Sequence, residues 1–182
     1  MVAVQISEWQ PDRVAPADLS RDLDMLADVL HAVVHSGAGV SFVVPFSIDE
    51  AHAFWRDNVL PGVRARTRHV VVARVGGRIV GTVQIDIATP PNQPHRAEVA
   101  KLLVHPEARR QGIARGLMIA LERLAQSIGR TLLTLDTWTD SHAEALYRSL
   151  GYVKVGVIPR YARGSTTTAL DSTTIMYKEL SR

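Results

Sequence analysis

Cysteine is absent from the 182-residue sequence, and its absence excludes disulfide bonds, zinc–thiolate sites and a cysteine acyl-enzyme. A chain without cysteine suits a reducing compartment, so we expect a cytoplasmic protein. No apolar run approaches the ~18 residues that a membrane-spanning helix needs, so we expect no membrane association. The first residues contain no basic segment followed by an apolar one, which predicts no signal peptide.

An excess of charge of either sign is also lacking. The sequence has 21 basic and 18 acidic residues, and its net charge of +3 is too small to indicate binding to nucleic acid. Its 46% hydrophobic and 21% charged residues are typical of a globular protein. Because no internal repeat or low-complexity linker is present, we expect residues 1–182 to form one domain.

Apolar periodicity predicts the secondary structure. A capping box at Ser47 and Glu50 opens a helix that Pro61-Gly62 is expected to end, and Gly76-Gly77 predicts a β-hairpin. Gly81 predicts a bulge or a close backbone contact within its strand. Other helices are expected over residues 19–34, 113–128 and 141–150. Strands are expected over residues 2–7, 69–75, 78–87, 98–104, 131–137, 152–158 and 172–180, with a polar loop over 159–171.

The resulting order is β-α-α-β-β-β-α-β-α-β-β, which predicts an α/β fold with a mixed central sheet flanked by helices. The stretch from Glu98 to Gly129 organises this fold, because it reads as a buried strand, a basic turn and an amphipathic helix. Gly112 and Ala114 remove side-chain bulk where the helix begins, so a phosphate could approach the unpaired N–H groups there. The stretch therefore predicts an anion cradle, and the alternative is an ordinary basic turn before a core helix.

The motif Arg109-x-x-Gly112-x-Ala114 resembles the pyrophosphate-binding signature of the GNAT acetyltransferase superfamily, Gln/Arg-x-x-Gly-x-Gly/Ala. The preceding Leu-Val-His-Pro and the whole order of elements are similar to GNAT enzymes as well. The resemblance implies a GNAT-type fold, acetyl-CoA as co-substrate and no metal. It places the cofactor on Leu102, Leu103, Val104, Arg109, Arg110, Gln111, Gly112, Ile113 and Ala114, with the backbone N–H of Leu102 polarising the thioester carbonyl.

Two acids, Glu98 and Asp136, interrupt otherwise apolar strands. Burial raises the pKa of a carboxyl group towards values useful for a general base, and the alternative is a strand-edge acid paired with an arginine such as Arg96. Strand alternation predicts that Glu98, Ala100, Leu102 and Val104 share one face. Glu98 also lies fourteen residues before Gly112, the spacing at which glutamate-based GNAT enzymes carry their base, so the resemblance assigns proton abstraction to Glu98 with help from Asp136.

Residues 143–152 resemble the GNAT segment in which a tyrosine faces the cofactor sulfur, which implies that Tyr147 protonates the departing thiolate. The alternative is a tyrosine that only packs on its helix. His31 and His35 lie one helical turn apart, but no third metal ligand is evident, so we expect no metal site.

Three segments, residues 35–42, 96–102 and 133–137, look like the tabtoxin-resistance acetyltransferases, which acetylate the free amine of a β-lactam amino-acid toxin. In that group the acids matching Glu98 and Asp136 form the proposed proton-transfer pair. The likeness implies that the loop from His35 to Phe42 lines the acceptor pocket.

Together these patterns predict an acetyl-CoA-dependent N-acetyltransferase that acts by direct attack in a ternary complex. The expected partner is a small amine or amino-acid-like molecule, such as a toxin or an antibiotic, and a homodimer is left open. One alternative is an acetyltransferase acting on a protein N-terminus or lysine. The other is a non-catalytic sensor that binds acyl-CoA without turnover.

Overall fold

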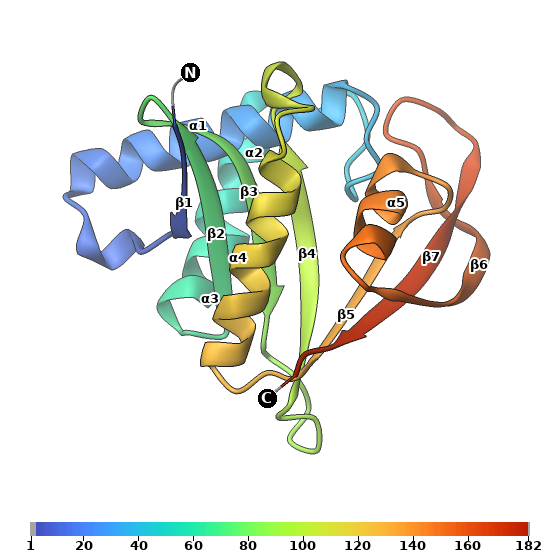
Figure 1. The fold of residues 1–182 in the computed structure, drawn as a ribbon. Coiled ribbons are helices and arrows are strands. Elements are labelled where there is room, and N and C mark those ends of the chain that lie inside the picture. Colours follow the sequence, from blue (N-terminus) through green and yellow to red (C-terminus); the bar gives the residue numbers. More distant parts are fainter. Residues whose placement is uncertain (1–2, 182) are drawn as a thin grey trace.

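The computed structural model describes residues 3–181, which form one seven-stranded sheet with helices on both faces (Figure 1). The strands are β1 (Val4–Glu8), β2 (Arg68–Val75), β3 (Arg78–Asp86), β4 (Arg96–Val104), β5 (Leu132–Trp138), β6 (Val153–Arg163) and β7 (Leu170–Glu179). The helices are α1 (Pro16–His35), α2 (Ile48–Ala53), α3 (Leu60–Arg64), α4 (Ile113–Ser127) and α5 (His142–Ser149), with short helical segments η1 (Pro11–Arg13), η2 (Phe54–Val59) and η3 (Pro106–Ala108).

The strands are arranged in the order β1-β2-β3-β4-β5-β7-β6. Neighbouring strands are antiparallel except β4 and β5, which are parallel. When α2, η2 and α3 are counted as one helical segment, the predicted order of elements is confirmed. The predicted α/β class with a mixed sheet is confirmed as well.

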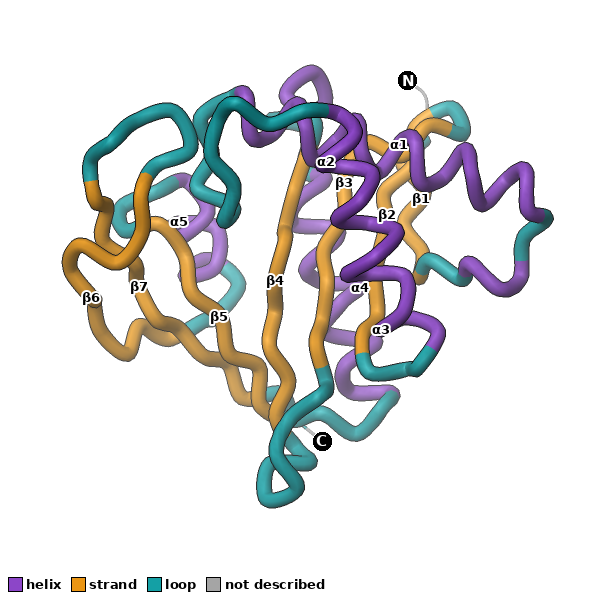
Figure 2. Tube along the Cα trace, turned by 180° about the vertical axis from the view of Figure 1, so that it is seen from behind, coloured by secondary structure: helices purple, strands orange, loops and turns teal. Residues whose placement is uncertain are grey.

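Two hydrophobic cores lie on opposite faces of the sheet. On one face α4 contributes Ile113, Leu117 and Leu121, and α5 lies on the same side (Figure 1). On the other face α1 contributes Leu26 and Leu30, and this side is also covered by α2 and α3 (Figure 2). Each fully buried leucine contributes about 1.5–3 kcal/mol relative to an exposed one, so apolar helix faces fix both layers to the sheet.

The glycines of the β2–β3 hairpin behave as the sequence predicts. Gly76 and Gly77 have φ of 58° and 83°, which is the left-handed conformation that a tight two-residue hairpin requires. Gly81 lies beside a register shift in the β2–β3 ladder. A Cβ at Gly81 would lie 3.0 Å from the carbonyl oxygen of Leu103 and 3.2 Å from Leu117 Cδ1. The predicted close backbone contact is confirmed, and it allows α4 to approach the sheet.

Two predicted boundaries are wrong, and prolines caused both errors. The helix that begins at the confirmed Ser47–Glu50 capping box continues past Pro61-Gly62 to Arg64. Its middle segment η2 is a π-helix, which shifts the hydrogen-bonding pattern ahead of the proline. β6 likewise continues beyond Pro159 to Arg163, because a register shift and an edge position tolerate the missing N–H.

A bulge in β4 also changes which side chains share a face. Lys101 has φ of 50°, and β4 carries one more residue than β3 between the pairs Gln84–Ala100 and Thr82–Leu103. Val99 therefore packs in the α4 core, whereas Leu103 packs in the α1 core. The prediction that Glu98, Ala100, Leu102 and Val104 share one face is wrong, because the bulge inverts the alternation after Ala100.

Within residues 3–181, none of the helices combines the length and the apolar character needed to cross a lipid bilayer.

Replacing Gly81 by valine is expected to destabilise the fold by about 1–3 kcal/mol, because the new side chain would overpack the β3–β4–α4 contact. The midpoint of urea denaturation should fall while its slope stays unchanged. The matched control is Gly156→Val in β6, where a Cβ meets nothing within 4 Å. Equal midpoints for the two variants would contradict the close-contact interpretation.

Candidate functional site

The loop between β4 and α4 ends in an unsatisfied helix N-terminus. Gly112 is the N-cap of α4, and its φ of 77° is left-handed. Among residues 3–181, no backbone or side-chain group accepts a hydrogen bond from the backbone N–H of Gly112, Ile113 or Ala114. A Cβ at Gly112 would meet nothing within 4 Å, so the space on that side of the glycine is open. The predicted anion cradle has the geometry that a phosphate needs.

A cleft of about 230 Å³ opens beside these amides. It is lined by Val104, Ala108, Arg109, Arg110, Gly112, Ile113, Ala114, Arg115 and Leu146. Most of the predicted cofactor residues therefore lie together. Gln111 is exposed on the loop, and the side chain of Leu103 is buried in the other core, so only its backbone is available to a ligand.

Arginine side chains give the cleft a positive charge. Arg109 donates to Ser36 Oγ at 2.7 Å and to the carbonyl oxygen of Val104 at 3.3 Å, and Arg115 donates to Ser149 Oγ at 2.7 Å. These acceptors are neutral, and no described acidic side chain lies within 4.0 Å of the guanidinium group of Arg109, Arg110 or Arg115. Uncompensated cations beside free amides favour a dianionic or polyanionic ligand.

Two neighbouring strands of the sheet, β4 and β5, separate next to this cleft. β4 and β5 pair only from Arg96–Leu132 to Glu98–Thr134, and the two strands then diverge, as Figures 1 and 2 show. Beyond Glu98 the edge of β4 that faces β5 has no strand partner among the described residues. Backbone groups along this edge are available to an extended ligand, which is the arrangement predicted for Leu102 to Val104.

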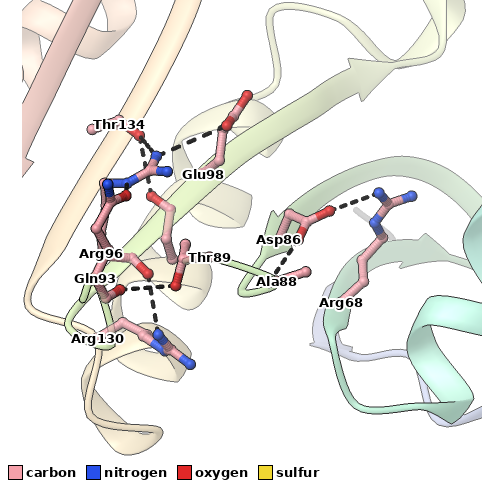
Figure 3. A network of polar contacts seen from close by, with 10 residues as sticks. Arg68, Asp86, Ala88, Thr89, Gln93, Arg96, Glu98, Arg130 and Thr134 are labelled. Atoms are coloured by element: carbon pink, nitrogen blue, oxygen red, sulfur yellow. Dashed lines mark hydrogen bonds and ion pairs between the residues drawn. The ribbon is translucent and has the colours of Figure 1, made fainter. Parts of the chain in front are cut away.

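Glu98 lies where the two strands begin to part, but it is not buried. Its side chain is 58% exposed, and its Oε2 lies 3.9 Å from Nη1 of Arg96 (Figure 3). Arg96 is held by a hydrogen bond of 3.0 Å to Thr134 Oγ1. The expectation of a buried carboxylate is therefore wrong, and the alternative pairing with Arg96 is what the structure contains.

Asp136 is exposed as well, on the far side of the parting. Its Oδ2 accepts a hydrogen bond of 3.0 Å from Thr173 Oγ1, which fixes the carboxylate to β7. The negative charge of Asp136 also acts on two other residues: it adds to the rise that burial causes in the pKa of Tyr147, and it opposes the fall that burial causes in the pKa of Lys101. Asp136 thus shares an electrostatic environment with two residues from other elements.

Tyr147 lies on α5, with only 6% of its surface exposed and its ring centroid 5.6 Å from that of Tyr152. Burial, and then the charge of Asp136, raise the pKa of its phenol well above the usual value. The raised pKa favours the protonated phenol, which can donate a hydrogen bond. The packing that the sequence offered as the alternative is present, because Tyr147 lies in the core that α4 covers, and the proton-donor role stays a prediction.

Glu144, which is not among the residues predicted from the sequence, fixes the start of α5. Its side chain is only 3% exposed. Burial would raise its pKa, but hydrogen bonds outweigh burial and lower the pKa to about 2. The donors are the backbone N–H of Asp140 at 2.7 Å, Thr174 Oγ1 at 3.1 Å, Arg148 Nη2 at 2.5 Å and Lys154 Nζ at 3.4 Å. The spacing Ser141-x-x-Glu144 is a capping pattern and would have pointed to this residue.

The loop over residues 36–47 is tied to β4 by Lys101. Its Nζ donates to the carbonyl oxygen of Val40 and to Ser41 Oγ, both at 3.0 Å, and lies 5.4 Å from the ring centroid of Phe42. Phe42, predicted to line the acceptor pocket, therefore lies at the bulge in β4. His35 lies at the end of α1, exposed, with its Nδ1 2.9 Å from the carbonyl oxygen of His31. No group of three or more potential metal ligands occurs among residues 3–181.

Comparison with known proteins gives a consistent picture. A family model described as the acetyltransferase (GNAT) family matches residues 34–152. An Azospirillum brasilense protein, the uncharacterized N-acetyltransferase in the hisH-hisA intergenic region, is 31% identical over 117 residues, which are 63% of this chain and 67% of that protein. N-alpha-acetyltransferase RimI of Mycobacterium tuberculosis is 37% identical over 103 residues, which are 56% of this chain and 62% of that protein.

The fold also has solved counterparts. The structure of yncA from Salmonella typhimurium with its cofactor acetyl-CoA has a TM-score of 0.77, with coverage of 99% of this chain and 95% of that one. Sequence identity is 17%, so this likeness concerns the fold alone.

Replacing Glu144 by glutamine should lower the free energy of unfolding by about 1–3 kcal/mol at pH 7, because the hydrogen bonds to an ionised carboxylate weaken. The folded pKa is about 2 and the usual value is 4.5, so this stabilisation is present above pH 4.5. It is lost as the pH falls towards 2, and the two proteins should converge there.

Urea denaturation over this pH range measures the difference between wild type and Glu144→Gln. Glu107→Gln, at a carboxylate that is 75% exposed, serves as the control and should change little. A difference between wild type and Glu144→Gln that does not vary with pH would contradict the assigned role of the ionised group.

Proposed function

Because the chain belongs to the GNAT acetyltransferase family, we propose that it acetylates a small primary amine or an amino-acid-like compound, by direct transfer in a ternary complex. Acetyl-CoA-dependent N-acetylation itself follows from the family and its relatives. The proposal concerns the acceptor and the roles of individual residues. It depends above all on one observation: the open amides of Gly112, Ile113 and Ala114 lie beside an arginine-lined cleft next to the parted strands.

In this proposal the pyrophosphate of coenzyme A is held by the amides at the start of α4, with the charges of Arg109, Arg110 and Arg115 in support. The free edge of β4 from Leu102 to Val104 orients the pantetheine arm. Acetyl-CoA supplies an acetyl thioester, whose carbonyl oxygen would accept a hydrogen bond from the backbone N–H of Leu102.

Two carboxylates are available to take the proton of an acceptor ammonium, which is charged at neutral pH. Glu98 lies where the strands part and is open to solvent. Asp136 is fixed by Thr173 and acts electrostatically on Tyr147. We assign proton abstraction to Glu98, directly or through water, and binding of the ammonium or relay of its proton to Asp136. Tyr147 Oη would donate a proton to the departing sulfur, and the proton that the attacking nitrogen loses as the amide forms would restore the phenol.

The candidate functions differ in the acceptor of the acetyl group. Similarity to a mycobacterial N-alpha-acetyltransferase favours a protein N-terminus as the second candidate. The likeness to tabtoxin-resistance acetyltransferases favours a β-lactam amino-acid toxin within the first candidate class. A thiol-release screen that supplies acetyl-CoA with small amines, free amino acids and peptides separates these candidates. If no amine in the screen causes thiol release, the result would support the non-catalytic acyl-CoA sensor instead.

Gly112→Asp should weaken the binding of coenzyme A by roughly 10- to 100-fold, because a carboxylate would stand in the phosphate approach. Calorimetry with coenzyme A measures this loss. The matched control is Gly129→Asp at the other end of α4, where φ is 76° and a Cβ also meets nothing within 4 Å. Unchanged affinity in Gly112→Asp, or an equal loss in both variants, would count against the cradle.

Glu98→Gln should lower kcat by about 100-fold or more while leaving the affinity for coenzyme A unchanged. The loss should be greatest at low pH, where the acceptor amine is most fully protonated. Thiol release measured across pH with an acceptor found in the screen tests this expectation, with Glu107→Gln as the control. An unaltered pH–rate profile would remove Glu98 as the base and leave Asp136 in that role.

A further inference from the structure

Among residues 3–181, Lys101 has no carboxylate partner. Its Nζ carries three protons, and the described residues supply two acceptors, the carbonyl oxygen of Val40 and Ser41 Oγ. No described carboxylate oxygen lies within 4.0 Å of Nζ. Burial of a lysine without an anionic partner is costly, and burial indeed lowers the pKa of Lys101, with Asp136 opposing the shift and Arg68 adding to it.

Two aromatic rings lie beside the ammonium group of Lys101. Its ammonium lies over the rings of Phe42 and Phe54, 5.4 Å and 6.0 Å from the centroids. The bulge that carries Lys101 adjoins Leu102, where the proposed function places the thioester. Asp136, near enough to influence the lysine but not paired with it, supplies an opposite charge on the other side of the parted strands.

We propose that Lys101 binds a carboxylate of the acceptor, so that the acceptor is an amine carrying its own carboxylate, as a free amino acid does. This inference rests on the proposed function, which places the acceptor between β4 and β5. The two charges of such a molecule match the two charges of the site, since the ammonium would face Asp136 and the carboxylate Lys101. In a peptide the α-carboxylate of the first residue is replaced by an amide, so the backbone at a peptide N-terminus offers Lys101 no anion.

Binding can be measured without any acetyl transfer. Calorimetry at saturating coenzyme A, which lacks the acetyl group, is performed with the standard L-amino acids, β-alanine and γ-aminobutyrate, and with the carboxamide of each. The proteins are wild type, Lys101→Met and Ser41→Ala. Ser41→Ala removes one contact to the loop but keeps the charge of Lys101, so it isolates the loop-holding role.

At least one acid should bind wild type about tenfold or more tightly than its carboxamide. In Lys101→Met this ratio should fall to about 1, with the Kd of the carboxamide changed by less than about threefold, whereas Ser41→Ala should keep the wild-type ratio. Comparing ratios between proteins cancels the intrinsic difference between acid and amide.

Two results would overturn the inference. One is a wild type that binds acids and carboxamides alike. The other is a Lys101→Met variant that weakens both kinds of ligand equally, which would assign Lys101 to holding the loop. If acids bind selectively through Lys101 but the protein releases no thiol from acetyl-CoA, the proposed function fails, while binding of an amino-acid carboxylate by Lys101 still stands.

Discussion

The short parallel contact between β4 and β5 is the constraint on which the site depends. Only three residue pairs join these strands, and their divergence after Glu98 leaves a free edge on β4. Most residues of the candidate site are grouped around this divergence. The amides of the α4 N-terminus open beside it, Tyr147 reaches it from α5, and the loop that carries Phe42 approaches from the opposite face. A sheet paired along its whole length would bury the same residues without forming a site.

The bulge at Lys101 is a second local feature of β4 that shapes the candidate site. One additional residue in β4 exchanges the faces of the strand, so that Leu102 and Val104 pack towards α4 while Leu103 packs towards α1. The same bulge directs a lysine towards the loop over residues 36–47. The strand that is expected to present its backbone to the cofactor therefore also presents a charge to the acceptor side.

Most of the fold could be predicted, because its elements are local. The Gly76-Gly77 turn, the capping box at Ser47 and the glycine at the start of α4 each carry their own chemical signature. The bulge could not be predicted, because a lysine in the left-handed conformation is imposed by pairing with β3 and leaves no sign in the sequence. The exposure of Glu98 and Asp136 escaped prediction for a related reason, since strand pattern does not show where two strands will part. Glu98 is predicted as a site residue because it is a charged residue in an otherwise apolar strand. The same criterion would have identified Lys101.

Two side chains tether the loop over residues 36–47 at different points of the site. Arg109 of the phosphate loop bonds Ser36 at one end, and Lys101 of the bulge bonds Val40 and Ser41 further along. The phosphate loop, which is expected to bind the cofactor, and the bulge, which is expected to bind the acceptor, therefore both contact the loop over residues 36–47. Thermodynamic linkage makes such communication symmetrical: whatever factor the first occupant adds to the affinity of the second, the second returns to the first.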